Sequence, residues 1–380
     1  MIDFSLTEEQ KALQKMARDF ARNEMAPLAA EHDDSGEFPW PVIRKAHALG
    51  LVNITIPEEY GGMGGSGIEE CIVAEELFSG CAGMGTSMLA NNLAYTPVML
   101  AGTHEQKERF LTLLADEPVM AAFCLTEPGA GSDVARLRTG ITKDGGDYIL
   151  NGSKMFITNG GVAQLYTVFA TFEPGKGNYR AFCAFTVPRD TPGISVGKKE
   201  DKMGHRASNT TEVIFENARL SKENLLGQEG EGFKIAMMTL DKSRAAIAAC
   251  AVGIARAAFE AARDYAKERK TFGKPLVAHQ AIQFMLADMA IKIETARLMC
   301  WKAAWLSDSG QPNNLESSIA KCYATDMCME VATDAVQVLG GYGYSREYPV
   351  EKYMRDAKLM QIYEGANQIQ RMVIARNVLQ

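Results

Sequence analysis

One acidic residue is placed where it could act as a base. Glu364 stands between Tyr363 and Gly365, after an apolar segment and directly before a predicted helix. A carboxylate in a dry pocket has a raised pKa and can remove a weakly acidic proton. An acid at the start of a helix also complements the helix dipole. For an isolated glutamate, that structural interpretation is the stronger one.

Two segments in the middle of the chain combine glycines, hydroxyls and an aromatic ring. Residues 123–133 read Phe-Cys-Leu-Thr-Glu-Pro-Gly-Ala-Gly-Ser-Asp, and residues 154–161 read Lys-Met-Phe-Ile-Thr-Asn-Gly-Gly. Glycines let a backbone approach a flat ring or a phosphate, and hydroxyls donate hydrogen bonds to ring atoms. Phe156 and Thr158 share one strand face, so both could touch one ligand. Taken singly, each segment is better explained as a loop between domains or a strand that ends in a turn.

Charged and glycine-rich residues also occur in and after the later helices. Arg269 and Thr271 could hold a phosphate, although basic residues at a helix C-terminus equally complement the helix dipole. The Gly-Gly-Tyr-Gly sequence at 340–343 follows a helix and lacks the GxGxxG spacing, so no Rossmann site is predicted. Asp241 and Arg244, inside a long helix, would ordinarily be a solvated charge pair.

The hydrophobic periodicity divides the chain into three parts, residues 1–120, 121–228 and 229–380. The first part is helical and opens with a capping-box pattern at Thr7 and Gln10. The last part is helical again, and long helices with short connections predict a bundle. Helices are predicted over 41–49, 67–79, 83–100, 104–115, 232–270, 278–308 and 315–339, and from about 367.

The middle part alternates with period two between turn residues, which predicts strands without intervening helices. The pair Asn151-Gly152 is one of the predicted separators. Short strands spaced this closely favour an antiparallel barrel or sandwich, and hence an α+β fold for the whole chain. Strands are predicted over 148–150, 154–158, 165–170, 181–185 and 211–215.

Composition and charge limit the classes of function. The net charge of −7 does not favour nucleic acid as a partner. The eight cysteines are scattered without a CxxC pair, which predicts reduced core thiols rather than a disulfide or metal framework. The N-terminus is amphipathic and unlike a signal peptide, and no run of about 18 consecutive apolar residues predicts membrane insertion. We therefore expect a cytoplasmic protein.

The motifs, taken in their order along the whole chain, resemble the acyl-CoA dehydrogenase family, and most closely its short- and medium-chain branch. The resemblance implies an N-terminal α-helical domain, a middle antiparallel β-barrel-like domain and a C-terminal four-helix bundle. It also implies one FAD per subunit, a homotetramer and an electron-transfer flavoprotein as partner. The motifs are Cys-Leu-Thr-Glu-Pro-Gly-Ala-Gly-Ser-Asp, Met-Phe-Ile-Thr-Asn-Gly-Gly, Asp-Lys-Met-Gly-His-Arg-Ala-Ser, Glu-Arg-Lys-Thr-Phe-Gly-Lys-Pro, Gln-Val-Leu-Gly-Gly-Tyr-Gly-Tyr, and Met-Arg-Asp-Ala-Lys with Ile-Tyr-Glu-Gly.

The same resemblance assigns roles to individual residues. Glu364 matches the catalytic base of the family. Ala366 stands where many relatives have threonine, so one hydrogen bond to FAD is expected to be missing. The residues implied to bind the substrate are Ser132, Asp241, Arg244, Tyr363 and Gly365. The residues implied to bind FAD, in part across a subunit interface, are Phe123, Leu125, Thr126, Gly131, Ser132, Phe156, Thr158, Arg269, Thr271, Phe272, Gln280, Gln337, Val338, Leu339, Gly340, Gly341, Ala366 and Gln368.

The implied reaction is the α,β-dehydrogenation of a short, medium, branched or aryl acyl-CoA, in which the base removes the α-proton and the flavin takes the β-hydride. The segment from Gly85 to Tyr95 is expected to form the floor of the acyl pocket.

The same site run in reverse is an enoyl- or aryl-acryloyl-CoA reductase, and the sequence hardly separates the two directions. A catalytically silent acyl-CoA-binding protein is an alternative of another class, although the retained Glu364 argues against it. An acyl-CoA oxidase fits less well, because those chains are typically much longer.

Overall fold

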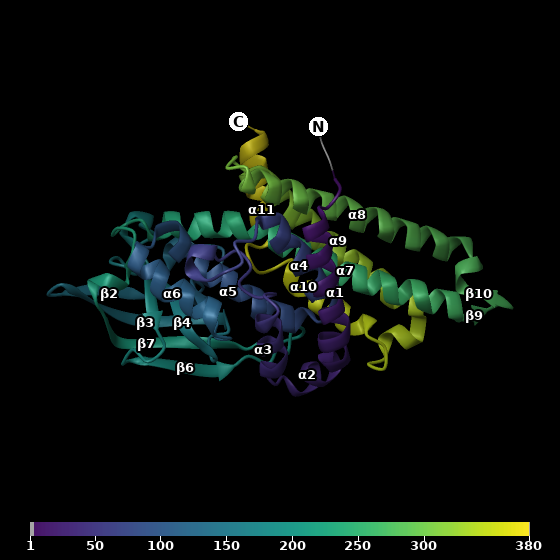
Figure 1. The fold of residues 1–380 in the computed structure, drawn as a ribbon, viewed down its shortest axis with the longest axis horizontal. Helices are drawn as coiled ribbons and strands as arrows, with labels where there is room; N and C mark the ends of the chain where they lie inside the picture. Colours follow the sequence, from purple (N-terminus) through teal and green to yellow (C-terminus); the bar gives the residue numbers. More distant parts are fainter. Residues whose placement is uncertain (1–3, 380) are drawn as a thin grey trace.

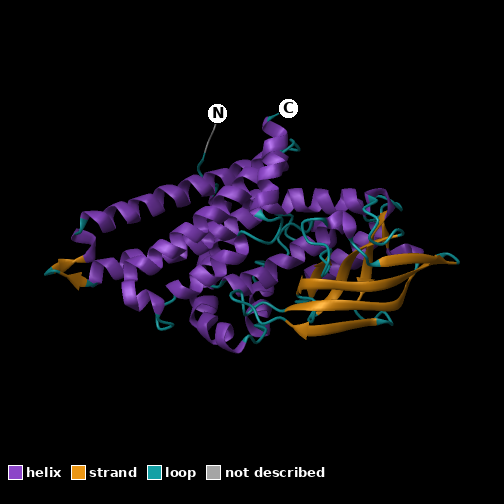
Figure 2. Cartoon of the chain, turned by 180° about the vertical axis from the view of Figure 1, so that it is seen from behind, coloured by secondary structure: helices purple, strands orange, loops and turns teal. Residues whose placement is uncertain are grey.

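The computed structural model describes residues 4–379 and shows an elongated molecule. A sheet with helices packed on it lies at one end of the long axis (Figure 1). Long helices run from there to a small β9–β10 hairpin at the other end, and apart from that hairpin the strands gather in one place (Figure 2). The α+β fold predicted from the sequence is confirmed.

Capping boxes start several N-terminal helices, as predicted for the first. In α1, Thr7 Oγ1 accepts a hydrogen bond from the backbone of Gln10 at 3.2 Å, and the Gln10 side chain accepts one from the Thr7 backbone at 3.1 Å. Ser66 and Thr103 cap later helices in the same way. The helices of this part are α1 (Glu8–Phe20), α2 (Ala29–Ser35), α3 (Trp40–Ala48), α4 (Gly67–Gly80), α5 (Ala82–Ala101) and α6 (His104–Asp116).

The middle part forms one sheet of eight strands in the order β6-β7-β3-β2-β4-β5-β8, with β1 paired to β4. Most pairs are antiparallel, but β1–β4 and β2–β4 are parallel, so the sheet is mixed rather than purely antiparallel. The strands are β1 (Met120–Cys124), β2 (Gly140–Asp144), β3 (Asp147–Thr158), β4 (Ala163–Thr171), β5 (Phe182–Pro188), β6 (Ile194–Lys199), β7 (Thr210–Leu220) and β8 (Leu225–Leu226).

The predicted break at Asn151-Gly152 is wrong. Strand β3 runs without interruption through both residues, and its pairing with β7 shifts register between Leu150 and Gly152. Gly152 has φ 145°, and a Cβ atom there would lie 2.7 Å from Thr139 Cα. The glycine therefore marks a bulge with a close backbone contact, which its sequence does not distinguish from a turn.

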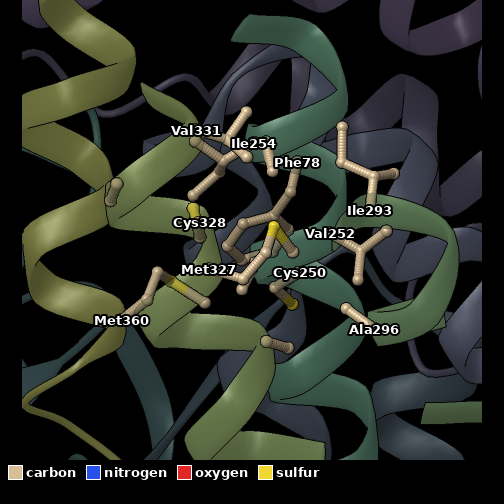
Figure 3. Close-up of a cluster of buried hydrophobic side chains, with 14 of the residues drawn as sticks. Phe78, Cys250, Val252, Ile254, Ile293, Ala296, Met327, Cys328, Val331 and Met360 are labelled. Carbon is tan, nitrogen blue, oxygen red and sulfur yellow. The ribbon is translucent and has the colours of Figure 1, made fainter. Parts of the chain in front are cut away.

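The C-terminal part is built around α7, which packs against α4, α8 and α9. The core between these helices contains Phe78 of α4, Cys250 and Ile254 of α7, and Met327 of α9 (Figure 3). Helix α7 is long and apolar enough to cross a membrane, but 83% of its most apolar window is buried, which is typical of a core helix. The elements are α7 (Gly232–Glu268), β9 (Lys270–Thr271), β10 (Lys274–Pro275), α8 (Gln280–Asp308), α9 (Asn314–Leu339), α10 (Val350–Met360) and α11 (Asn367–Val378).

Candidate active site around Glu364

The loop between α10 and α11 holds Glu364 in a left-handed backbone conformation. Glu364 has φ 55° and Gly365 has φ 93°. A non-glycine residue rarely adopts such a φ, and it persists only where surrounding contacts hold it. Lys321 Nζ donates a hydrogen bond to the Gly365 carbonyl at 2.7 Å, and Gln370 Nε2 donates one to the same oxygen at 3.2 Å. The protein thus fixes an otherwise unfavourable turn under the carboxylate.

Lys321 is a functional candidate that the sequence analysis missed. The residue lies on α9, is fully buried, and also donates to Asn367 Oδ1 at 2.9 Å. Asn367 in turn donates to Asp326 Oδ1 at 2.7 Å, so the start of α11 is tied to α9. Burial lowers the pKa of Lys321 to about 8, although Glu364 opposes this. No local pattern marks this lysine, because its partners lie more than 40 positions away.

The carboxylate of Glu364 points to α7. Ser243 Oγ donates a hydrogen bond to Glu364 Oε2 at 2.8 Å. Burial raises the pKa of Glu364 above its ordinary value of 4.5, whereas the Ser243 hydrogen bond and the cations of Lys321 and Arg244 lower it. Burial is the larger cause, so the group is closer to the range useful for a base than a free glutamate is.

Asp241 and Arg244 are not the solvated pair that a helix surface would give. The Arg244 side chain is 7% exposed and forms an ion pair with Asp241, which is 34% exposed. Asn314 Nδ2 donates to Asp241 Oδ1 at 2.8 Å, and Arg244 NH1 reaches Ser318 Oγ at 3.5 Å. The pair therefore contacts α9 on the inner side of the bundle, on the same turn of α7 as Ser243.

Two of the sequence motifs, residues 201–208 and residues 354–358, contact each other beside Tyr363. The rings of His205 and Tyr363 lie 6.1 Å apart, and His205 Nδ1 lies 2.8 Å from Thr86 Oγ1. The backbone of His205 donates to Asp356 Oδ1 at 2.6 Å, and Lys352 donates to the other carboxylate oxygen at 2.6 Å. This buried network joins the loop after β6 to α10, and thereby supports the Glu364 turn.

The hydroxyl-rich loop after β1 lies beside the end of β3. The backbone of Met155 donates to the Thr126 carbonyl at 2.8 Å. The buried Lys154 donates to Glu127 Oε1 at 2.8 Å and to the Leu125 carbonyl at 3.2 Å. Glu127 also accepts from the Thr139 backbone at 2.8 Å, so one buried ion pair holds both ends of the loop. The sequence analysis did not identify this pair.

The predicted flavin residues in this region range from exposed to buried. Phe156 is 61% exposed with φ 57°, at a second register shift between Lys154 and Ile157, and Thr158 beside it is half-buried. Gly131 and Ser132 are exposed on the loop. Leu125 is buried and Thr126 half-buried, whereas the Phe123 ring packs 5.0 Å from the Phe169 ring.

The remaining predicted cofactor residues lie elsewhere. Arg269 stacks on the Tyr342 ring at 5.5 Å, and Thr271 Oγ1 lies 3.2 Å from His279 Nε2. Phe272 at the tip of the β9–β10 hairpin is 97% exposed. Gln280, Gln337, Gly340 and Gly341 are exposed near the same end of the molecule, Val338 and Leu339 bury their side chains in the bundle, and Ala366 and Gln368 flank the start of α11 beside Glu364.

These residues fit a flavin dinucleotide. An aromatic ring such as Phe156 that remains exposed on a strand can cover a flat ring system, and the hydroxyls of Thr126 and Thr158 can donate to it. A Cβ atom at Gly340 or Gly341 would meet no other atom within 4 Å, so the backbone there is open to a ligand. Among residues 4–379, no group of at least three His, Cys, Asp or Glu side chains could hold a metal ion.

Comparisons with known proteins agree with this architecture. Three family models match, described as the N-terminal, middle and C-terminal domains of acyl-CoA dehydrogenase, over residues 7–118, 122–218 and 230–379. The chain is 47% identical to the acyl-CoA dehydrogenase of Bacillus subtilis, covering 98% of this chain and 99% of the relative. It is 44% identical to the short-chain specific acyl-CoA dehydrogenase of Clostridium acetobutylicum, covering 99% and 100%.

Solved structures are equally similar. The butyryl-CoA dehydrogenase of Megasphaera elsdenii matches with a TM-score of 0.97 and 45% identity over 100% of both chains. A chain of the structure described as electron transferring flavoprotein of Acidaminococcus fermentans, towards a mechanism of flavin-based electron bifurcation, matches with a TM-score of 0.97 and 47% identity, again over 100% of both. The protein therefore belongs to the acyl-CoA dehydrogenase family, the FAD-dependent oxidoreductases that act on acyl-CoA thioesters.

Proposed function

We propose that this protein catalyses the α,β-dehydrogenation of a short-chain acyl-CoA, with Glu364 as the base. The observation that carries the proposal is the placement of Glu364: a carboxylate with a raised pKa, held on a fixed left-handed turn and facing α7. An α-proton beside a thioester is weakly acidic, so its removal needs a correctly oriented carboxylate of raised pKa. FAD, when bound, supplies the acceptor for the β-hydride.

The protein groups around the base have separate roles in this proposal. Ser243 orients the Glu364 carboxylate, and Lys321 holds the turn from beneath. Asp241 and Arg244, together with Ser132, line the channel for the coenzyme A part of the substrate. Phe156 and Thr158 face the flavin from β3. Tyr363 and Gly365 bound the space beside the thioester.

A short acyl chain is the favoured substrate. Two of the similar proteins are described as short-chain specific and as a butyryl-CoA dehydrogenase. In this chain, α5 brings Leu89 against the same apolar cluster that Tyr363 packs on. A large aliphatic side chain at this point shortens the space available to the acyl group.

The position of the predicted FAD residues supports a site shared between two copies of the chain. Ser243 and Arg269 belong to one continuous helix and its end, and 26 residues at a rise of about 1.5 Å separate them by about 39 Å. Phe156 lies on the sheet and Phe272 on the β9–β10 hairpin, at opposite ends of the molecule in Figure 1. We propose that the hairpin of a second copy completes each site, as expected in a homotetramer.

Anaerobic titration of the purified holoprotein with acyl-CoAs of increasing length tests this function. Butyryl-CoA should bleach the flavin absorbance of the wild-type protein within the mixing time. Glu364→Gln should retain its yellow colour and bind the ligand, but bleach more slowly by a factor of about 10²–10⁴. Wild-type rates in Glu364→Gln would remove Glu364 from its role.

The reverse direction is a second candidate. The similarity to a chain in the structure of an electron transferring flavoprotein from Acidaminococcus fermentans favours an electron-transfer flavoprotein as partner. Such a partner could either receive electrons from this protein or deliver them, in which case Glu364 would protonate the α carbon of an enoyl-CoA. NADH-dependent reduction of crotonyl-CoA in the presence of the flavoprotein would support the reductase direction. Acceptance of electrons from butyryl-CoA alone would support the dehydrogenase.

We also propose the cytoplasm as the compartment. The eight cysteines are all buried and free, which suits a reducing environment. The similar proteins from Bacillus subtilis and Clostridium acetobutylicum are bacterial. A silent acyl-CoA-binding role does not account for the hydrogen-bonded placement of Glu364 on its left-handed turn.

A further inference from the structure

A small cavity with three polar side chains in its lining lies between α4, α5 and the loop after α3. Its volume of about 10 Å³ has room for one group of the size of a water molecule. Most of the lining is apolar, including Val73, Leu77 and Leu89, but three polar side chains also face it. These are Asn53, Glu70 and Asn92.

The polar side chains present hydrogen-bond acceptors. Asn92 Nδ2 donates to Glu70 Oε1 at 2.7 Å, and Asn53 Nδ2 donates to the Leu114 carbonyl at 2.6 Å. Both asparagines are more than nine-tenths buried, yet the Oδ1 atoms of both have no hydrogen-bond partner among the described residues. A buried carbonyl oxygen without a donor costs free energy. The cavity is therefore chemically matched to a small donor group.

This cavity belongs to the same region as the proposed acyl pocket. Leu89 of α5 lines the cavity and, like Tyr363, packs against the large apolar cluster of the helices. Burial raises the pKa of Glu70, and the carboxylate of Glu364 raises it further, so the two acids are near enough to interact. Cys250 of α7, labelled in Figure 3, is affected by both Glu70 and Glu364. The cavity thus adjoins α5 through Leu89 and Asn92, in the segment expected to form the floor of the acyl pocket.

We propose that Glu70, Asn92 and Asn53 form a polar subsite at the far end of the acyl pocket, which accepts a hydroxyl group at the end of a short acyl chain. This inference rests on the proposed function and specifies its substrate class. A hydroxyl can donate its one hydrogen bond to one of the two unpaired oxygens, whereas a methyl group of similar size leaves both unpaired. Binding pockets discriminate strongly when a missing substrate group leaves buried polar atoms without partners.

The test compares matched substrates. Coenzyme A thioesters of four, five and six carbons with a terminal hydroxyl are each compared with the chain in which a methyl group replaces the hydroxyl. Flavin bleaching gives kcat/KM, and the shift of the flavin spectrum on titration with the corresponding 2-enoyl-CoA gives Kd without turnover. At one acyl-chain length, the hydroxylated substrate should have a kcat/KM about tenfold or more above that of its methyl counterpart, as expected for one hydrogen bond. The Kd of the hydroxylated 2-enoyl-CoA should be lower by about the same factor.

Variants connect that preference to the subsite. Glu70→Leu combined with Asn92→Leu removes two hydrogen-bonded partners together, so that neither of them is left unpaired, and should reduce the preference several-fold, because Asn53 Oδ1 is then the one acceptor left in the subsite. Glu69→Gln is the matched control, because Glu69 is the neighbouring residue of α4, bonds to Ser66 in the capping box, and does not line the cavity. Glutamine is also accepted at that capping position, so the control should keep the preference.

The outcomes separate this inference from the proposed function. A wild-type protein that is bleached by butyryl-CoA but shows equal kcat/KM and Kd for both members of every pair overturns the subsite alone. An undiminished preference in the double variant also overturns it. If no saturated thioester bleaches the flavin, the proposed dehydrogenation fails, while the Kd comparison with 2-enoyl-CoAs still decides the subsite.

Discussion

Glu364 combines a raised pKa with an enforced backbone turn. Its carboxylate accepts a hydrogen bond from Ser243, and its neighbour Gly365 accepts one from the buried Lys321. The first contact fixes the direction of the carboxylate, and the second fixes the chain that carries it. Preorganisation of this kind lowers the barrier because no reorientation is needed during proton transfer.

The pH dependence of activity follows from the pKa of Glu364. Because burial raises this pKa, the carboxylate forms only at a higher pH than in a free glutamate. In the dehydrogenase direction, kcat/KM of the wild-type protein should rise with pH through that pKa and then level off. The measurement is the rate of flavin bleaching by butyryl-CoA across pH. A flat profile would contradict the assignment of the base.

The same shift predicts a stability effect. The folded protein binds the Glu364 proton more tightly than the unfolded chain, so the cost of the charged form is absent below pH 4.5 and grows as pH rises through the folded pKa. Glu364→Gln removes a charge and should raise Tm by a margin that increases from pH 5 to pH 8. Calorimetry of the two holoproteins measures this margin, and an equal Tm at both pH values would count against it.

Lys321 should act as a positioning residue. In Lys321→Met the Gly365 carbonyl loses its shortest hydrogen bond and the Glu364 carboxylate loses a nearby cation. We expect kcat to fall by roughly 10²-fold, as for a small misplacement of a reacting group. The apparent pKa of the kcat/KM profile should also rise, because the lost cation had favoured the charged carboxylate. A lower kcat with an unmoved profile would indicate a structural role only.

At the scale of elements, one buried ion pair connects a loop to the sheet. Lys154 of β3 and Glu127 of the loop after β1 are 0% and 4% exposed, and Glu127 also accepts backbone hydrogen bonds from the start of the next segment. Burial lowers the pKa of Lys154, although Glu127 opposes this. The pair holds Thr126 beside Phe156, where the flavin ring is proposed to lie.

Breaking this pair should destabilise the protein. Lys154→Met leaves a buried carboxylate without its cation, which costs about 3–5 kcal/mol. We expect a lower urea midpoint and weaker retention of FAD, measured by flavin release on dilution. The double variant Lys154→Met with Glu127→Gln removes both charges and should recover most of the midpoint. Failure of the second change to restore any stability would show that packing, not charge, is responsible.

At the scale of the whole molecule, the two groups of proposed FAD residues lie far apart. Phe156 lies on β3 of the sheet, whereas Arg269 ends α7 and Phe272 lies on the β9–β10 hairpin at the opposite end (Figure 1). A closed symmetric assembly could bring the hairpin of one copy to the sheet of another. Each copy would then need the other for a complete site.

Complementation tests this arrangement. Glu364→Gln and Arg269→Ala should each be inactive alone, the second through loss of FAD affinity. When the two variants are denatured together and refolded with FAD, sites that combine Glu364 of one copy with Arg269 of the other are intact, and about a quarter of wild-type activity should return. No recovery, in a preparation shown to contain mixed oligomers, would place both residues in the same chain's site.

Local patterns in the sequence predicted the positions of most long helices. The ordered motifs indicated the candidate base. The capping box at Thr7 and the long apolar periodicities act between residues a few positions apart, and therefore they predict helix positions. The ordered motifs, including Glu364, indicated the family and so the fold. The domain boundaries and the roles of the site residues remain predictions.

Only the tertiary structure decided how Glu364 is held and what surrounds it. Ser243, Lys321 and the pair of Lys154 with Glu127 act through partners 27 to 121 positions away, and local periodicity contains no information about such partners. The bulge at Gly152 likewise depends on close contact with Thr139, which a turn signal cannot reveal. The sequence thus indicated the candidate base, whereas long-range packing determined the orientation of its carboxylate and the direction in which its pKa is shifted.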